Sequence, residues 1–412
     1  MDRPKGPGSG FRKHTPSQMT SRLYYRDAYL TAFEGSITEI ADGGRRVYLD
    51  RSAFYPTSGG QPFDLGTLGS TPVSDVIDED ERIAHVLAAP LAAHGIGDVV
   101  AGTIDWSRRF DHMQQHTGQH LLTAVFVELL GYDTVSVHFG SDRSSLDLDV
   151  GAVSSDQLLE AERRANEIVW ENRPVTVTFE DSATAAGLRK PPPRSGTIRV
   201  VSIDRLDRSA CGGTHVRATG EIGAIALRGT ERMRKQTRVE FLCGGRVVRQ
   251  SRDDHEALSR IALALKASMA EAPALVLAQG EQLRDAVTTI KQLESELAAY
   301  KARALYDATP PGRTGVRVAV VQRETGTLDG MRPLAQAFVA LPHSVLIATV
   351  ASPATVLVTA SDDSGLDAGA ELKGQLQAAG GRGGGSARMA QGTVPSAELL
   401  AGVVYGIRSA VP

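Results

Sequence analysis

Two short stretches decide how this chain folds: His-Thr-Gly-Gln-His at residues 116–120 and Cys-Gly-Gly-Thr-His at residues 211–215. Each contains a pair of metal-binding side chains four positions apart, and on a helix such a pair lies on one face. Because the two stretches are far apart in the chain, folding must bring them together, and we expect them at the centre of a domain. They offer three imidazoles and one thiolate, a donor set that suits tetrahedral Zn²⁺: His116, His120, Cys211 and His215.

The sequence leaves the role of such a metal open. Thr117 stands where zinc peptidases carry a glutamate base, so a peptidase of that kind is not expected. Four protein ligands describe a closed structural site, whereas a displaceable ligand would leave a position for substrate. His112 lies on the same helical face as His116. Four roles remain open for it: a further metal ligand, a hydrogen-bond partner of a ligand, a substrate contact or a packing residue. The simplest alternative to a metal is two surface histidines and an unrelated buried cysteine.

Composition and charge indicate a globular protein with several domains and exclude some other classes. The chain has 412 residues, of which 42% are hydrophobic and 23% charged, which is typical of a globular protein with two or three domains. Its net charge of −3 excludes a polycation, so any nucleic-acid binding must use local basic patches. The two cysteines argue against a disulfide framework and favour a reducing, cytoplasmic location. No apolar run reaches about 18 residues, so we expect no membrane span.

The order of helical and strand patterns predicts an α+β protein of several domains. The residues 1–23, rich in Gly, Pro and Ser, predict a disordered tail. Alternating runs and turns predict a β-rich, barrel-like domain over residues 24–103, and a mixed α+β domain over residues 104–248 contains both metal motifs. A helical region over residues 249–309 and a small, glycine-rich α/β domain over residues 310–412 complete the prediction.

The helical region, which the sequence interrupts at Pro273, contains a seven-residue apolar repeat. Such a repeat predicts the a/d seam of a short coiled coil or helical hairpin. The partner helix lies either in the same chain or in a second protomer, so a homodimer through this region or through the C-terminal domain is one expectation. The repeat consists of Leu283, Ile290 and Leu297, followed three places later by Ala286, Leu293 and Tyr300.

Two kinds of polar segment have the composition of binding sites: basic clusters and a small polar loop. The basic stretch over residues 228–238, which includes Arg234, carries five cations and one acid and can hold phosphates, and Arg189 and Lys190 form a second basic pair. A solvated charged loop is the alternative. The other segment is a loop whose two hydroxyls, two glycines and carboxamide suit a small polar substrate, although an ordinary turn has the same composition. It consists of Thr57, Ser58, Gly59, Gly60 and Gln61.

A glycine run over residues 380–386 includes Gly383, Gly384 and Gly385. Such a run indicates either a flexible surface loop or close approach of a ligand to the main chain. It is not a Walker loop, because no Gly-Lys-Ser/Thr follows it.

Together these motifs carry a family resemblance. Residues 54–62, 116–122 and 211–215 resemble, in this order, the motifs of alanyl-tRNA synthetase editing domains and of free-standing AlaX-type editing proteins. Residues 223–244 resemble the stretch that follows the cysteine motif there. Residues 380–392 resemble the Gly-rich domain at the end of alanyl-tRNA synthetase, which DHH phosphoesterases share. Only the predicted tail precedes the β-rich domain and leaves no room for a class II aminoacylation domain, so the resemblance is to the long free-standing form.

The resemblance implies a trans-editing hydrolase, an aminoacyl-tRNA deacylase that removes serine from mischarged tRNA(Ala) and does not charge tRNA itself. It leaves open whether glycine is also removed. It further implies that residues 104–248 form a zinc editing domain and that residues 310–412 bind tRNA or form dimers. Editing of a threonine-type tRNA is an alternative, although the Gly-rich domain argues for alanine. A non-catalytic, zinc-stabilised tRNA-binding protein is another.

The resemblance also assigns roles to residues. It implies that the four residues of the two metal motifs bind zinc, that Thr57 helps recognise the serine hydroxyl and that Gln61 lines the pocket. The implied catalytic set is Thr57, Gln61, His116 and Cys211. The implied substrate contacts are the loop of residues 57–61, His112, Arg234, Gly383, Gly384 and Gly385.

Overall fold

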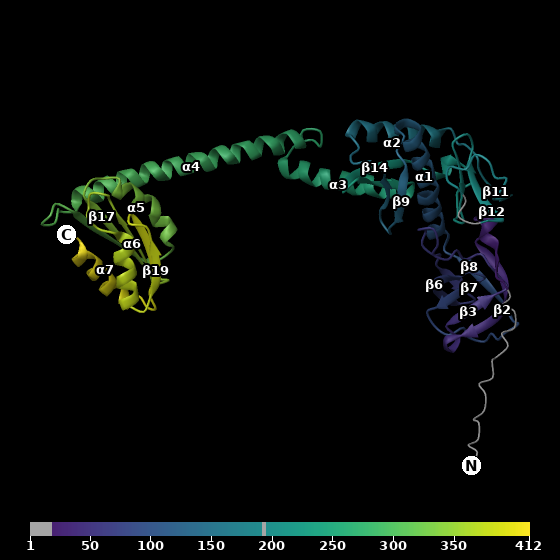
Figure 1. Cartoon of the computed structure of the whole chain (residues 1–412), viewed down its shortest axis with the longest axis horizontal. Helices are drawn as coiled ribbons and strands as arrows, with labels where there is room; N and C mark the ends of the chain where they lie inside the picture. The colour runs from purple at the N-terminus through teal and green to yellow at the C-terminus, as the bar shows by residue number, and fades with distance from the viewer. Residues whose placement is uncertain (1–18, 192–194) are drawn as a thin grey trace, which may run out of the picture. The chain divides into compact units, whose positions relative to one another are not determined.

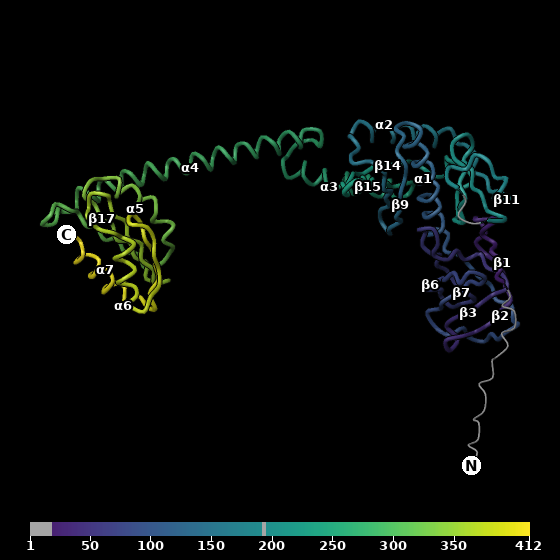
Figure 2. The backbone as a smooth tube through the Cα atoms, viewed as in Figure 1, coloured from purple at the N-terminus to yellow at the C-terminus, as the bar shows by residue number. Residues whose placement is uncertain are grey.

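A computed structural model describes residues 19–191 and 195–412 (Figures 1 and 2). The contacts group the chain into two compact units, one that ends at Ser259 and one over Arg260–Pro412. Most of the predicted tail lies outside the described residues. Its last part differs from the prediction, because Ser21–Arg22 (β1) pairs in parallel with Arg51–Ser52 (β4).

The first unit begins with a closed six-stranded barrel, in which the strands neighbour one another in the order β2-β3-β7-β6-β5-β8. Aromatic and aliphatic side chains fill it, with Phe33, Phe54 and Leu68 among the buried ones. The alternation of buried and exposed residues along β8 follows the period of two that a half-buried strand requires. The strands are β2 (Ala32–Ala41), β3 (Arg46–Leu49), β5 (Gly66–Leu68), β6 (Thr71–Glu79), β7 (Arg82–Leu87) and β8 (Val99–Ile104).

The rest of the first unit packs two helices and two sheets around one apolar core. The helices are α1 (Trp106–Leu130) and α2 (Ser155–Trp170). One sheet has the order β14-β15-β10-β9, and the other has the order β11-β12-β13. Their strands are β9 (Thr134–Phe139), β10 (Ser144–Leu148), β11 (Val175–Asp181), β12 (Thr197–Ile203), β13 (Asp207–Ala210), β14 (Ile225–Met233) and β15 (Gln236–Cys243).

Helix α1 lies at the centre of this core. It begins where the Asp105 side chain accepts a hydrogen bond from the amide of Arg108, and it ends at Gly131, whose φ of 68° suits a left-handed cap. Nearly every residue of its middle turns is buried. At Gly118 a Cβ atom would lie only 2.3 Å from Cys243 Sγ, so the helix approaches β15 more closely than any side chain allows.

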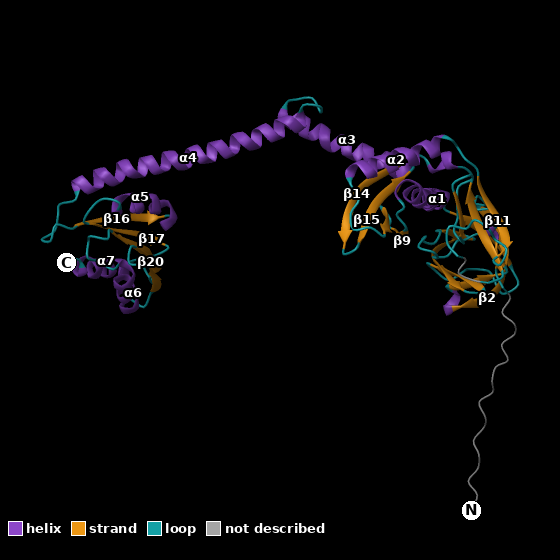
Figure 3. Cartoon of the chain, turned by 45° about the horizontal axis from the view of Figure 1, so that its top comes forward, coloured by secondary structure: helices purple, strands orange, loops and turns teal. Residues whose placement is uncertain are grey.

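The second unit is a five-stranded sheet of order β16-β17-β18-β20-β19 between two layers of helices (Figure 3). Alternate residues of β17 enter two separate cores: Val345 and Ile347 pack with α6 and α7, whereas Leu346 and Ala348 pack with α5 and the end of α4. The strands are β16 (Arg317–Thr325), β17 (Ser344–Ser352), β18 (Thr355–Ala360), β19 (Arg382–Gly385) and β20 (Met389–Thr393). The helices are α5 (Arg332–Val339), α6 (Ala368–Ala378) and α7 (Glu398–Ala410).

The structure of the glycine run differs from the expected flexible loop. It is neither a flexible loop nor open to a ligand on both sides, because Arg382–Gly385 forms the edge strand β19, paired with β20. A Cβ atom at Gly383 would lie 2.3 Å from the carbonyl oxygen of Gln391, and one at Gly385 would lie 2.2 Å from that of Met389. The close approach therefore comes from the neighbouring strand.

The predicted helical region consists of two helices, α3 (Gly245–Leu265) and α4 (Ala272–Ala308), with Pro273 in the first turn of α4. On α4 most of the apolar repeat is exposed: Leu283, Ile290, Leu297 and Tyr300 are each more than half accessible. Within the described chain these side chains have no covering helix, so a coiled-coil partner remains a prediction.

The prediction of a multidomain protein of mixed α and β structure is confirmed. No helix in the described ranges combines the length and the apolarity that crossing a bilayer requires.

A buried ion pair connects α1 to the barrel. The Arg109 and Asp64 side chains are 1% and 0% exposed, and Arg109 Nε donates to Asp64 Oδ1 over 2.9 Å. The guanidinium also donates to the carbonyl oxygens of Ala28 and Ala53, while Asp64 accepts from the amide of Tyr55. Removing one partner of such a pair leaves a buried charge without compensation.

We therefore expect Asp64→Ala to lower the free energy of unfolding of the first unit by about 3–5 kcal/mol. Both tryptophans, Trp106 and Trp170, lie in that unit, so urea denaturation followed by their fluorescence measures it selectively. Glu39→Ala, which removes the partly exposed pair with Arg82, is the matched control and should cost less than about 1 kcal/mol. Equal losses for the two variants would contradict the structural role of the buried pair.

Candidate metal centre and its cavity

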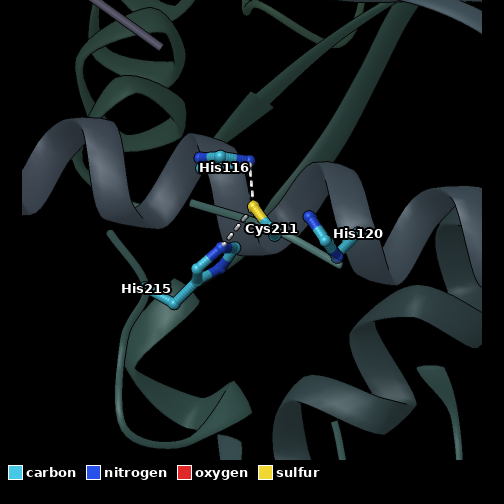
Figure 4. Close-up of side chains that lie close together, drawn as sticks. All are labelled: His116, His120, Cys211 and His215. Atoms are coloured by element: carbon cyan, nitrogen blue, oxygen red, sulfur yellow. Dashed lines mark hydrogen bonds between the residues drawn. The ribbon is translucent and has the colours of Figure 1, made fainter. Parts of the chain in front are cut away.

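The four predicted metal-binding side chains meet in one place (Figure 4). Their ligand atoms all lie within 4.8 Å of one another. Cys211 Sγ is 3.5 Å from His116 Nε2 and 3.4 Å from His215 Nε2. Ordinary zinc–sulfur and zinc–nitrogen bonds in a tetrahedron place such atoms about 3.6 Å apart, so the cluster has the spacing of a four-coordinate site.

Secondary structure explains how the ligands converge. His116 and His120 occupy successive turns of α1, whereas Cys211 and His215 lie in the loop that follows β13. At Gly213 a Cβ atom would lie 2.1 Å from Cε1 of the His116 ring, so the loop can cross this imidazole only with glycine. The amide of Gly213 donates to Cys211 Sγ over 3.4 Å, which stabilises negative charge on sulfur.

Each imidazole is oriented through its second nitrogen. In all three rings Nδ1 contacts a polar side chain, which leaves Nε2 directed at the cluster. Three separate segments supply the partners, so the orientation of the ligands depends on the whole unit. The pairs are His116 with Gln61 Oε1 at 2.8 Å, His120 with Asp207 Oδ2 at 2.9 Å and His215 with Thr117 Oγ1 at 3.1 Å.

The electrostatics favour a thiolate at the cluster. Burial raises the pKa of Cys211, but the imidazoles of His116 and His215 outweigh burial and hold it well below its usual value. Burial lowers the pKa of His215 to about 3, which keeps this ring neutral and able to bind a metal. Burial alone would raise the pKa of Asp207, but its hydrogen bond with His120 and its ion pair with Arg189 lower it to about 2.

Beside the cluster lies a cavity of about 360 Å³. Polar and apolar groups line it in similar measure, and its walls come from the loop that follows β4, from α1, from β13 and from the segments before and after β13. The lining residues are Tyr55, Ser58, Gly59, His116, Gln119, His120, Arg189, Lys190, Pro191, Ser209, Ala210, Cys211, Gly212 and Gly213.

The residues of the loop 57–61 have different surroundings in the structure. Ser58 and Gly59 line the cavity. Gln61 is 1% exposed and lies behind His116, where its Oε1 also accepts from the amide of Thr214. Thr57 is exposed, and its hydroxyl accepts a hydrogen bond from the amide of Phe63.

Other residues singled out in the sequence lie apart from the four ligands. His112 is buried one turn before His116, and its Nδ1 has no hydrogen-bond partner among the described residues. Arg234 lies in the exposed turn between β14 and β15. Gly383, Gly384 and Gly385 belong to the second unit.

Sequence reasoning missed several side chains of this site. Asp207 and Ser209 precede Cys211 at intervals of two on or just after a strand, and that period could have placed them on the face of the cysteine. Gln119 stands inside the first metal motif, and its Nε2 donates to Thr123 Oγ1. Lys190 was singled out as half of a basic pair, but no spacing placed it at the cavity, because an irregular segment carries it there.

Comparison with known proteins defines the class. The family model named "Threonyl and Alanyl tRNA synthetase second additional domain" matches residues 198–240, which contain the cysteine motif and all or most of β12, β13, β14 and β15. This match lies within the first unit.

Relatives identify the family more closely. The alanyl-tRNA editing protein AlaX-L of Pyrococcus horikoshii is 30% identical over 91% of this chain and 95% of its own length. The chain belongs to the AlaX family of alanyl-tRNA editing proteins. An alanyl-tRNA editing protein of Xenopus laevis is 38% identical over 54% of this chain, and the alanine–tRNA ligase of Pyrococcus abyssi is 29% identical over 91% of it. The match spans only 58% and 42% of those two relatives.

We expect Asp207→Asn to weaken metal binding about 10- to 100-fold, because the amide no longer fixes the tautomer and angle of the His120 ring. Competition with a chromogenic chelator measures this change. The matched control is Asp204→Asn, whose carboxylate is exposed and pairs only with Arg205 among the described residues. Unchanged affinity in Asp207→Asn would show that the carboxylate does not orient the ligand.

Proposed function

We propose that the protein is an aminoacyl-tRNA deacylase that hydrolyses the ester between serine and the 3′ end of tRNA(Ala), with Zn²⁺ held by the four-residue cluster. The observation that carries the proposal is the cavity at the cluster. Membership of a family whose members are named alanyl-tRNA editing proteins supports an editing activity and tRNA(Ala) as the tRNA. At about 360 Å³ the cavity has the size of a small-molecule site, which suits an aminoacyl group and the ribose that carries it.

Selection of alanine explains why such an activity is needed. A pocket that accepts the alanine methyl group cannot strongly exclude glycine, nor serine, which only adds a hydroxyl. A second site that hydrogen-bonds the serine hydroxyl can reject alanine, because buried polar groups would then lose their partner. Glycine offers no such hydroxyl, so serine is the substrate that this cavity is expected to prefer.

The chain's own residues would position the ester. Gln119 lines the cavity, and its Nε2 donates to Thr123 Oγ1, so we assign its Oε1 the role of accepting the serine hydroxyl or ammonium. Ser58 and Gly59 line the same cavity. From this loop we propose, following the family resemblance, that Thr57, which lies next to Ser58, recognises the serine hydroxyl. Bound Zn²⁺ would supply a fixed positive charge and a Lewis acid near the ester.

The proton of the attacking water needs an acceptor. None of the described residues that line the cavity is Asp or Glu. We assign this step to the free hydroxyl of the terminal ribose beside the ester, which takes up the proton of the water while it passes its own proton to the departing ribose oxygen. The C–O ester bond breaks, and the free amino acid and the tRNA with two ribose hydroxyls are released. The protein then contributes by orientation and by charge.

Contacts with the tRNA body are proposed for the exposed basic turn that carries Arg234, since cations on such a turn can neutralise phosphates. Gly383, Gly384 and Gly385 are proposed as a second contact through the main chain at the outer edge of the second unit's sheet.

A non-catalytic tRNA-binding protein is the main alternative, and the completeness of the ligand set favours it, because four protein ligands are typical of structural zinc. The family model also covers threonyl-tRNA synthetases, so a threonine-type tRNA is the alternative substrate.

The deciding experiment is deacylation of Ser-tRNA(Ala), Gly-tRNA(Ala) and Ala-tRNA(Ala) by the zinc-loaded protein. We expect serine to be released at least about 100-fold faster than alanine. Cys211→Ala should lose both zinc and activity, whereas Cys243→Ala, which removes a buried thiol outside the cluster, should keep its zinc. Zinc-loaded protein that binds tRNA but releases no amino acid would establish the non-catalytic alternative, and faster hydrolysis of Ser-tRNA(Thr) would establish the threonine-type one.

A further inference from the structure

The cavity at the cluster contains two cations whose role the ester chemistry does not explain. Arg189 and Lys190 both line it, although they come from an irregular segment with no regular secondary structure. None of the described residues that line the cavity is Asp or Glu, and of these two cations Asp207 behind the wall pairs with Arg189 alone. Lys190 has no such partner in the described chain, so an anionic group of the substrate can balance its charge.

Arg189 is held rigidly in this position. Its Nε donates to Asp207 Oδ1 over 2.8 Å and its Nη2 to Ser209 Oγ over 2.9 Å, while its main-chain amide donates to the carbonyl oxygen of Arg208. The guanidinium has five N–H donors, so these two side-chain contacts leave Nη1 without a hydrogen-bond partner among the described residues. Since Asp207 also bonds His120, the guanidinium is fixed relative to the metal ligands.

Lys190 is placed without a balancing charge. Its Nζ donates to the carbonyl oxygen of Thr134 at the start of β9, over 2.7 Å. No carboxylate of the described chain forms an ion pair with it. An ammonium held by a single neutral acceptor has two further donors for a ligand.

We propose that Arg189 and Lys190 form a phosphate-binding subsite for the phosphodiester on the 5′ side of the terminal nucleotide. The proposal rests on the proposed function, because the substrate is then an amino acid esterified to a nucleotide. A planar guanidinium and a neighbouring ammonium are the groups that commonly bind a phosphate, one through directed hydrogen bonds and one as a point charge. With the ester at the metal and the phosphate at these cations, the terminal nucleotide has a fixed orientation in the cavity.

The test uses inhibition of Ser-tRNA(Ala) hydrolysis by adenosine, by adenosine 5′-monophosphate and by inorganic phosphate, at constant ionic strength. We expect the monophosphate to inhibit at a concentration about tenfold lower than adenosine, as one charge-assisted contact predicts. Lys190→Gln should remove this difference, and Lys190→Arg should keep most of it. Arg205→Gln, which removes an exposed cation outside the cavity, should leave it unchanged.

The outcomes separate the two proposals. Wild-type protein that hydrolyses Ser-tRNA(Ala) but is inhibited equally by adenosine and its monophosphate would overturn the phosphate subsite while the deacylase stands. A difference that persists in Lys190→Gln and in Arg189→Gln would overturn the assignment to these residues. Inhibition by inorganic phosphate as strong as by the monophosphate would assign the subsite to a free anion and overturn its link to the nucleotide. Absence of hydrolysis in wild-type protein would overturn the proposed function itself.

Discussion

The first unit depends on the burial of helix α1. Few helices are enclosed on every side, and α1 is buried from its second turn almost to its end, including its polar side chains. Buried polar groups must find hydrogen-bond partners inside the protein, so each one ties the helix to a neighbour. Arg109 ties it to the barrel, and Gln115 pairs with both the amide and the carbonyl oxygen of Cys243 on β15. These hydrogen bonds also fix the positions of His116 and His120, the two residues of the candidate metal cluster on α1.

Hydrogen bonds of buried polar side chains also connect the barrel to the candidate metal cluster. Gln61 comes from a barrel loop, yet its side chain contacts a ligand on α1 and the main chain of the cysteine loop. The barrel is therefore part of the support of the metal centre. A change in its packing would reach His116 through one carboxamide, because a hydrogen bond that orients a ligand transmits small displacements.

Some residues of the candidate site could be predicted from the sequence and others could not, for physical reasons that differ from residue to residue. The spacing of four in each metal motif predicted which side chains meet, because a helix and a tight glycine loop both restrict where they point. For His116 and His120 this spacing suits a helix, and both residues lie on α1. Asp207 was missed because a carboxylate on a strand has no pattern of its own until the fold places His120 beside it.

The glycine run illustrates the opposite case. Its composition indicated mobility or a ligand, whereas the structure pairs it as a strand, because the decisive contact is the Gln391 carbonyl oxygen on β20. The composition of a segment does not indicate which strand, distant in sequence, will pair with it. For the apolar repeat on α4, the seven-residue period predicted a helix correctly. Most of the repeat is exposed, and a helix from another protein chain that would cover it leaves no signal in this sequence.

The positions of the two cysteines have a further consequence for chemical labelling. Cys243 is fully buried against α1, while Cys211 lies on the cavity wall. A small alkylating reagent can therefore reach one of the two thiols, and coordination to a metal would withdraw that thiol from reaction. Stoichiometric modification thus counts metal-free molecules directly, and oxidative damage at this single sulfur would eliminate the site while the fold around it persists.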